Sequence, residues 1–302
     1  MRNEDVMAVV LLAGGSGFIG QALSAQLSER GDRVLRLVRR PARNNEEIPW
    51  DPSAGVLDPR HLEGVDAVVN LCGANVGEGS WTLRRRQVLR ESRIDPTHLL
   101  AATCAKAGVR TLVNASATGI YGDRGEEMLD ERSASGGGFL ADLCVAWEHA
   151  LRPADDTAVR VVRMRFGLVL DPHGGVLPWM MLATRLCMGG PIGSGLQWTP
   201  WISRTDAVRT LLHAVDHRLV SGPVLAVAPG ICRQKDMARA IARAMHRPAW
   251  VRLPAAAVSA ALGERGRELL LYSQRCRPSV LTDSGFVWKH PDLASALELL
   301  RE

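Results

Sequence analysis

The sequence predicts an α/β protein with a doubly wound parallel sheet. Five apolar segments have the character of buried strands, and they alternate with segments of helical character. This alternation is typical of parallel sheets whose two faces are both covered by helices. The five strand segments cover residues 6–12, 34–38, 66–74, 111–122 and 159–165. After a helix over 205–219, the segment 224–228 is expected to rejoin the sheet.

A glycine-rich turn follows the first strand and precedes a helix in which Leu23 and Leu27 share one face. Glycines permit a tight turn and a close approach of a pyrophosphate, and the helix N-terminus supplies free N–H groups. Strand, glycine turn and helix together predict a Rossmann-type dinucleotide site, the alternative being an ordinary strand–helix turn. The expected contacts are Gly14, Gly15, Ser16, Gly17, Phe18, Ile19 and Gly20.

The end of the second strand bears on the choice of cofactor. A site that prefers NAD(H) often places Asp or Glu about 20 residues past the glycines, where it binds the ribose 2′-hydroxyl. Here Arg39 and Arg40 stand at the strand end instead. Guanidinium groups suit a 2′-phosphate, so the pair favours NADP(H). The alternative is that both arginines are simply solvated.

Composition narrows the class of protein. The chain has 302 residues, 46% of them apolar, which is enough for a large core. No apolar run reaches the roughly 18–20 residues of a membrane span, so no membrane partner is expected. Six scattered cysteines without a C-x-x-C pair indicate reduced thiols and a cytoplasmic protein, with no zinc site.

The charge and histidine patterns support neither nucleic-acid binding nor metal binding. The net charge of +5 is modest, and the run Arg84–Arg86 is typical of a solvated helix face, so no nucleic-acid partner is expected. His213 and His217 lie four apart on one helix, but neither the metalloprotease glutamate nor a third ligand accompanies them, so no metal is expected.

Two regions of different character predict two domains. Residues 1–166 are expected to form the dinucleotide-binding domain, to which 204–229 returns. Residues 167–203 and 230–302 are expected to form a smaller, mostly helical lobe that covers the nicotinamide end and builds a substrate pocket. The polar, glycine-rich segment 123–138 is expected to be a mobile loop, and the helix over 81–107 to break or bend at Pro96.

Motifs along nearly the whole chain carry a family resemblance. The chain resembles the atypical extended short-chain dehydrogenase/reductases of the NAD-dependent epimerase superfamily, and within them the cell-division-inhibitor-like group with its C-terminal segment. This implies a Rossmann fold that binds NADP(H). The matching stretches include Gly14–Gly20, Trp50–Pro52, Asn70–Gly73, Ser92–Arg93, Ser116–Gly122, Phe139–Ala141, Trp147–Glu148, Gly189–Gly195, Gln197–Trp198, Trp201–Ile202, Gln274–Arg275 and Gly285–Phe286.

The resemblance also assigns cofactor contacts. It places the 2′-phosphate on the arginine pair after the second strand, and the adenine and ribose beside the end of the strand over 66–74. Two further arginines are in reach of the cofactor, although either could instead form a structural salt bridge. The residues expected to contact the cofactor beyond the glycine turn are Arg39, Arg40, Leu71, Cys72, Gly73, Arg93 and Arg165.

The sequence departs from the superfamily at its catalytic pair. Typical members use Tyr-x-x-x-Lys, in which Lys lowers the pKa of the Tyr that serves as acid and base. The chain has only two tyrosines, and Tyr121 and Tyr272 are followed four positions later by Gly125 and Cys276. Counted back from the matching Trp–Glu motif, the expected positions hold Leu140 and Cys144. The usual proton-transfer pair is therefore absent.

Substitutes for the pair are conceivable. Tyr121 could act as the acid with help from an arginine, Ser116 or Thr118 could orient a carbonyl, and Cys144 could act if its thiol faced the pocket. The alternatives are that Tyr121 has a structural role and that Cys144 is buried and inert. The group's expected Trp-Ile-His-x-Asp-Asp motif also changes here, because Ser203 replaces its His and Thr205 replaces its first Asp.

Two functions remain open. The first is an NADP(H)-dependent oxidoreductase or epimerase-like enzyme that acts on a small carbonyl or alcohol, with a sugar nucleotide among the candidates. The second is a non-catalytic NADP(H)-binding redox sensor or partner-binding module that kept the cofactor site and lost the acid–base pair. A homo-oligomer is compatible with the resemblance, although no diagnostic interface helix is evident.

Overall fold

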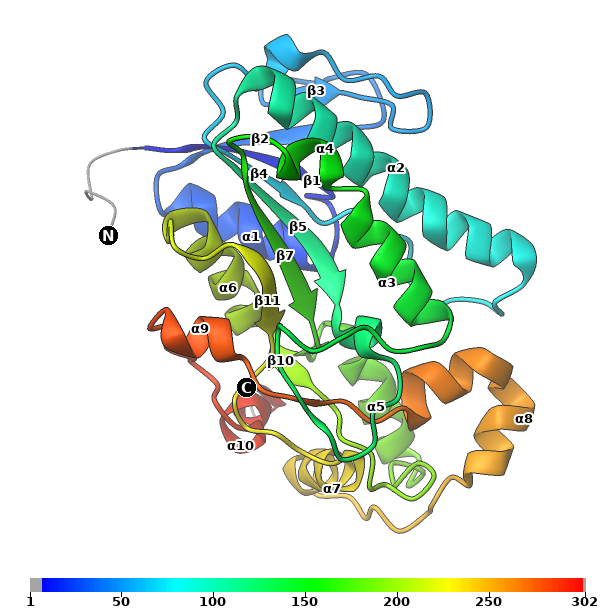
Figure 1. The fold of residues 1–302 in the computed structure, drawn as a ribbon. Coiled ribbons are helices and arrows are strands. Elements are labelled where there is room, and N and C mark those ends of the chain that lie inside the picture. Colours follow the sequence, from blue (N-terminus) through cyan, green and yellow to red (C-terminus); the bar gives the residue numbers. More distant parts are fainter. Residues whose placement is uncertain (1–6, 301–302) are drawn as a thin grey trace.

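A seven-stranded parallel sheet forms the centre of the computed structural model, which describes residues 7–300 (Figure 1). Its strand order is β3-β2-β1-β4-β5-β7-β11, an order typical of nucleotide-binding folds. The predicted fold class is confirmed, and the predicted return strand pairs with β7 in parallel. The strands are β1 (Val9–Ala13), β2 (Arg33–Val38), β3 (Glu47–Pro49), β4 (Ala67–Asn70), β5 (Thr111–Ala117), β7 (Arg160–Phe166) and β11 (Gly222–Ala226).

Helices cover both faces of the sheet, and the central strands β4 and β5 are correspondingly buried along almost their whole length. Helices α1 (Phe18–Glu29) and α6 (Arg204–Asp216) lie on one face, and α2 (Leu83–Ala107), α3 (Phe139–His149) and α4 (Arg152–Asp155) lie on the other (Figure 1). The expected break at Pro96 is absent, because α2 runs through it as one helix of 25 residues. Thr82 caps its start, and Gly108 ends it in the left-handed conformation, with φ 67°.

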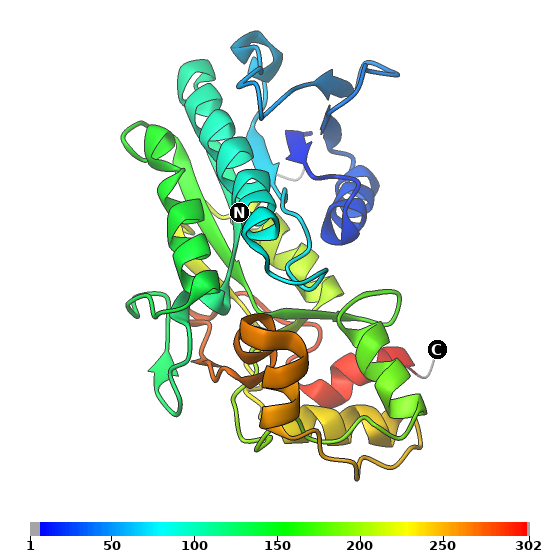
Figure 2. The ribbon, with the colours of Figure 1, turned by 90° about the vertical axis from the view of Figure 1, so that its right-hand side faces the viewer.

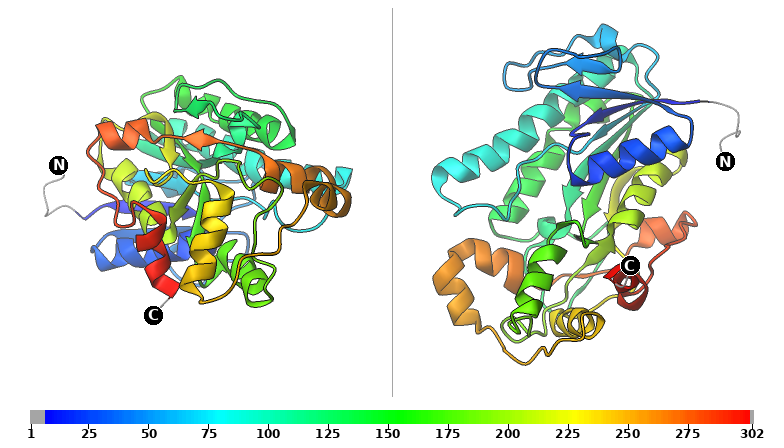
Figure 3. Two further views of the ribbon diagram at one scale, coloured as in Figure 1. Left: turned by 90° about the horizontal axis from the view of Figure 1, so that it is seen from below. Right: turned by 180° about the vertical axis from the view of Figure 1, so that it is seen from behind.

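A second, smaller layer lies below the carboxyl ends of the strands (Figure 2). It holds a three-stranded sheet of order β10-β8-β9 and most of the later helices. Helices α7 and α10 lie side by side at its lower end (Figure 3) and share one apolar cluster. Its elements are β8 (Leu168–Asp171), β9 (Gly174–Gly175), β10 (Trp201–Ser203), α5 (Leu177–Arg185), α7 (Gln234–Ala244), α8 (Ala255–Gly266) and α10 (Leu293–Leu297). Helix α9 (Ser279–Asp283) packs instead against β11 of the central sheet.

The segment 123–138 is pinned in place, contrary to the expectation of a mobile loop. Strand β6 (Met128–Leu129) within it pairs with β12 (Arg275–Cys276) from the C-terminal part of the chain. Its far end returns to η2, the short helix after β5, where the Gly136 N–H donates to the Ile120 carbonyl at 2.9 Å. The partner strand is remote in sequence, so local polarity gave no sign of it. The remaining short helices are η1 (Pro59–Leu62), η2 (Thr118–Tyr121), η3 (Arg267–Leu271) and η4 (Glu298–Leu300).

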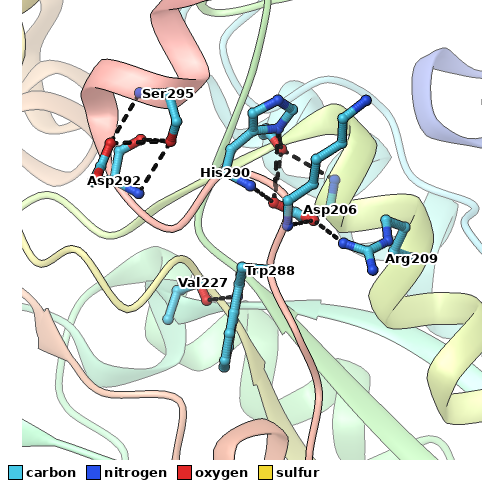
Figure 4. A network of polar contacts seen from close by, with 9 residues as sticks. Asp206, Arg209, Val227, Trp288, His290, Asp292 and Ser295 are labelled. Atoms are coloured by element: carbon cyan, nitrogen blue, oxygen red, sulfur yellow. Dashed lines mark hydrogen bonds and ion pairs between the residues drawn. The ribbon is translucent and has the colours of Figure 1, made fainter.

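A fully buried carboxylate ties the C-terminal segment to the start of α6 (Figure 4). Asp206 accepts hydrogen bonds from the backbone N–H groups of Lys289 and His290, at 2.8 and 2.7 Å, and from Arg209 at 3.0 Å. Ser203 caps α6 and lies 2.9 Å from Nδ1 of His290. The serine that replaces the expected histidine thus supports this attachment.

The histidine in this network predicts a dependence of stability on pH. Burial lowers the pKa of His290 from its ordinary value, outweighing the opposing charge of Asp206. The unfolded chain therefore binds the proton more readily than the native state as pH falls through the range near 6.5, and stability is lost in that direction.

We expect His290→Asn to weaken this pH dependence, because the amide can keep the hydrogen bond to Ser203 without titrating. The measurement is the free energy of unfolding in urea at pH 8 and pH 5.5. The exposed His61 provides the matched control, His61→Asn. An identical loss of stability on acidification in wild type and His290→Asn would contradict the assignment.

Candidate functional site

The glycine turn between β1 and α1 brings three backbone segments into close contact. Gly14 has φ +78°, and a Cβ at this position would lie 2.8 Å from the carbonyl carbon of Leu71 after β4. A Cβ on Gly20 would lie 2.8 Å from Cα of Gly15 and would clash with the Gly14 carbonyl oxygen. Gly17 is the N-cap of α1 and offers no side chain to the first N–H groups. These donors can therefore bind an anion.

A cleft of about 1260 Å³ opens beside this turn, between the carboxyl ends of β2 and β4 and the helix α2. Parallel sheets of this type bind ligands in the same place. The cleft brings together most of the predicted cofactor contacts, which are Gly14, Gly15, Ser16, Gly17, Arg39, Arg40, Leu71, Cys72 and Gly73.

Three predicted residues of the turn face away from the cleft. Ile19 packs against the core, and Gly20 serves close packing within the turn. The ring of Phe18 lies against Gly174 in β9, and the Arg204 guanidinium lies 4.7 Å from the ring centroid. Phe18 therefore joins the glycine turn to the smaller layer.

The two arginines after β2 have different surroundings. Arg40 forms a bidentate pair with Glu47 of β3, at 2.7 and 2.6 Å, and this pair holds the pKa of Glu47 at about 2. Arg39 is exposed and forms no ion pair or hydrogen bond with the residues that the structure describes. Arg39 is thus the guanidinium available to a ligand phosphate, and Arg40 is held beside it.

Sequence reasoning missed other polar groups of the cleft. Arg36 lies in β2, three residues before Arg39, and lines the same cleft. Its Nη2 donates to the Ser24 hydroxyl in α1 at 2.9 Å. Glu91 and Asp95 line the opposite wall on α2. Burial, together with the charge of Glu91, raises the pKa of Asp95. The alternation of β2 and the helical spacing of α2 were the signals that could have identified these residues.

Cys72 lines the cleft, and Arg93 lies against Gly73 without lining the cleft itself. Burial raises the pKa of the Cys72 thiol to about 12, so this group stays protonated. Arg93 is buried, donates to the Ala74 carbonyl at 3.0 Å and stacks over Trp147. Among residues 7–300 it has no carboxylate partner, and burial lowers its pKa.

Arg165 lies in a closed, buried network at the carboxyl ends of β5 and β7. Its guanidinium binds both oxygens of Glu148, each at 2.8 Å, and donates to the Tyr121 hydroxyl at 2.8 Å. Ser116 donates to Glu148 at 2.6 Å, and Tyr121 donates to the Asp130 carbonyl at 2.8 Å. Burial alone would lower the pKa of Arg165, but the bonds to Glu148 raise it above its ordinary value.

This network decides what its members can do chemically. Tyr121 is completely buried, and burial raises its pKa despite the neighbouring Arg165. A tyrosine that acts as acid and base near neutral pH needs the opposite shift. Ser116 is committed to Glu148. Thr118 follows β5, and its hydroxyl forms no hydrogen bond within the described residues. Of the three predicted catalytic hydroxyls, only Thr118 is free of such a bond.

Helix α3 lacks the usual catalytic side chains where they would be expected. Leu140 and Cys144 pack beside Gly119, and burial raises the pKa of Cys144 to about 12. At the start of the helix the carboxylate of Glu268, from η3, accepts from the Phe139 and Leu140 N–H groups, both at 2.8 Å. The C-terminal part of the chain thus caps α3, a contact that sequence reasoning missed.

Residues 7–300 show neither a metal-binding cluster nor a membrane-spanning helix. No group of three His, Cys, Asp or Glu side chains in this range could hold a metal ion, and His213 and His217 stack at 4.9 Å. No helix within the same range has the length and apolar character required to cross a bilayer. In the arginine run at the start of α2, Arg86 pairs with Glu264 at 2.5 Å.

Comparison with known proteins identifies the family. Residues 10–228 match the model of the NAD dependent epimerase/dehydratase family, and the chain belongs to this family. Residues 253–300 match a second model, the domain of unknown function DUF1731. The predicted resemblance is therefore confirmed, including its C-terminal segment.

Relatives are similar over almost their whole length. The epimerase family protein Mb2239 of Mycobacterium bovis is 46% identical over 290 residues, which are 96% of each chain. The human epimerase family protein SDR39U1 is 35% identical, over 96% of this chain and 98% of the human one. A crystal structure of human SDR39U1 with NADPH superposes with a TM-score of 0.88 at 33% identity, and covers 97% of this chain and 99% of that chain.

The close backbone approach in the glycine turn predicts that only one of two similar glycine-to-alanine substitutions destabilises the protein. Gly20→Ala forces a methyl group against the Gly14 carbonyl, and overpacking of this kind typically lowers the free energy of unfolding by about 1–3 kcal/mol. Gly15→Ala is the matched control, because its Cβ would be 3.5 Å from the nearest atom. Thermal unfolding of the two variants checks this, and equal melting temperatures would refute the packing argument.

The buried network predicts a structural role for Tyr121. Tyr121→Phe leaves buried polar groups short of a partner, which lowers the free energy of unfolding by about 1–2 kcal/mol. We expect nucleotide affinity to change less than twofold. The other tyrosine supplies the control, Tyr272→Phe, because Tyr272 forms no side-chain hydrogen bond within the described residues. Unchanged stability together with tenfold weaker nucleotide binding would place Tyr121 at the cofactor instead.

Proposed function

We propose that this chain binds NADP(H) in the cleft beside the glycine turn and acts as an oxidoreductase or epimerase-like protein on a small carbonyl or alcohol. One observation carries the proposal: anion-binding backbone N–H groups and an arginine cluster line the same cleft. The family and the NADPH in the human relative's crystal structure support it. Sugar nucleotides are one substrate class to test.

The proposal gives each part of the cleft a role. The glycine turn receives the pyrophosphate, because its N–H groups and the dipole of α1 favour negative charge. Arg39 binds the 2′-phosphate, and Arg40 stays oriented by Glu47. Arg36 adds positive charge at the same end of the cleft. Asp95 on the opposite wall suits donors of the adenosine.

At the nicotinamide end the protein contributes little acid–base chemistry. When bound, NADP(H) would supply the hydride chemistry at this end, and a carbonyl oxygen reduced there would need a proton. Thr118 orients this oxygen by a hydrogen bond and relays the proton from water. Tyr121, Ser116 and Arg165 are positioning residues, because their polar groups bind one another.

A specific observation favours the second candidate, a non-catalytic NADP(H)-binding sensor or partner-binding module. Tyr121 and Ser116 are held by Arg165 and Glu148 in a buried network, so neither predicted catalytic hydroxyl is available as a proton donor.

Single-turnover oxidation of bound NADPH separates the two functions. Aldehydes, ketones and sugar nucleotides are added in turn, and loss of the reduced nicotinamide absorbance is followed. Turnover that falls at least tenfold in Thr118→Val supports the enzyme; binding without oxidation of NADPH supports the sensor.

We also propose a cytoplasmic protein with a small-molecule substrate and no nucleic-acid partner. Its six cysteines are all unpaired thiols, which suits a reducing compartment. A homo-oligomer is compatible with this proposal, and light scattering of the purified chain measures its mass.

The separate environments of the two arginines yield a prediction for cofactor preference. Arg39→Ala removes a charged hydrogen-bond donor to the 2′-phosphate, so NADPH affinity falls about tenfold to hundredfold while NADH affinity is unchanged. Arg40→Ala has a smaller effect because Glu47 already engages that side chain. Fluorescence titration measures both affinities, with Arg33→Ala at the other end of β2 as the control. Parallel losses of NADPH and NADH binding in Arg39→Ala would argue against a 2′-phosphate contact.

A further inference from the structure

An apolar stripe runs along the outer side of α5 and faces solvent. Trp179, Leu182 and Leu186 recur at helical spacing, and Trp179 is 73% exposed. The opposite face of the helix is buried through Leu177 and Thr184. A short surface helix normally turns its apolar stripe inward, so this outward stripe requires an explanation.

The stripe continues onto a neighbouring segment. After α5 the chain passes the exposed Met188 and then runs beside residues 249–253. Two backbone hydrogen bonds join these segments, from Leu253 N–H to the Pro191 carbonyl at 2.9 Å and from Gly193 N–H to the Leu253 carbonyl at 2.8 Å. The exposed apolar side chains of these neighbouring segments, here called the apolar ridge, are Trp179, Leu182, Leu186, Met188, Trp250 and Val251.

The ridge lies in the longest acid-free part of the lobe. Residues 172–205 and 237–263 contain no Asp or Glu, but they contain six arginines. Arg204 and Arg239 pair with aspartates that lie just outside these ranges. The exposed Arg185 and Arg247 flank the ridge, and neither forms an ion pair with a described residue. The surface is therefore apolar and positive together.

We propose that this ridge docks the protein on an anionic phospholipid surface. Tryptophan and long apolar side chains favour the interfacial region of a bilayer, and flanking arginines favour acidic headgroups. Trp250 is 87% exposed and so stands out from the surface, which suits insertion between lipids. This contact is peripheral, so the expectation of no membrane partner, drawn from the lack of a spanning segment, does not address it. None of the ridge residues lines the cofactor cleft.

Sedimentation with vesicles tests the proposal on the full chain. Vesicles of phosphatidylcholine alone are compared with vesicles that contain one part phosphatidylglycerol in three. We expect binding to the anionic vesicles, weakened by salt because charge contributes to it. Replacing Arg185 or Arg247 with glutamine lowers affinity about fivefold for each charge removed. Trp250→Ser lowers it about tenfold through lost apolar burial. Leu219→Ser is the matched control, because Leu219 is 87% exposed on a different segment.

A second readout keeps the test independent of variant stability. Brominated phosphatidylglycerol quenches tryptophan fluorescence at short range, and we expect the quenching to fall in the Trp179→Phe/Trp250→Phe double variant while binding is retained. Failure of wild type to sediment with anionic vesicles overturns the proposal. Equal binding by wild type and Trp250→Ser also overturns it. Loss of self-association in Trp250→Ser, measured by light scattering, would instead identify the ridge as a contact between copies of the chain.

Discussion

The close backbone approach between the start of α1 and the glycine turn is the constraint on which the site depends. Gly20 and Gly14 have no Cβ to separate these segments, so α1 begins directly beside the ends of β1 and β4. The first N–H groups of the helix therefore face the cleft, while Leu23 and Leu27 bury the same helix against the sheet. Phe18 extends the contact to β9, so the turn also positions the smaller layer.

The two parts of the site differ in whether their polar side chains are available to a ligand. Beside the glycine turn, Arg39 is available to a ligand, while Glu47 holds Arg40 and the Ser24 hydroxyl holds Arg36. At the carboxyl ends of β5 and β7, Tyr121 and Ser116 satisfy Arg165 and Glu148, a buried ion pair that needs its hydrogen bonds to be tolerated. The hydroxyls of Tyr121 and Ser116 are thus already hydrogen-bonded in a chain that lacks the Tyr-x-x-x-Lys pair.

The sequence predicted what depends on local pattern. Apolar strands, the glycine turn and the parallel return of β11 follow from periodicity and from the chemistry of glycine. It did not predict contacts between distant segments: β6 with β12, Glu268 at the start of α3, and Glu47 beside Arg40. In each of these contacts, the fold and not the local sequence pattern determines which group becomes the partner. The mobile loop expected at 123–138 was wrong for this reason, since glycine content signals flexibility only where no partner strand lies alongside.

In the proposed function, the cleft recognises an adenosine with a 2′-phosphate even though the usual catalytic pair is absent. Calorimetric titration with adenosine 2′,5′-bisphosphate and with adenosine 5′-monophosphate tests it most directly, because these ligands lack the nicotinamide and differ only in the 2′-phosphate. We expect the bisphosphate to bind at least about tenfold tighter, through charge-assisted hydrogen bonds to the arginine cluster. Equal affinities, or no binding of either ligand, would contradict it.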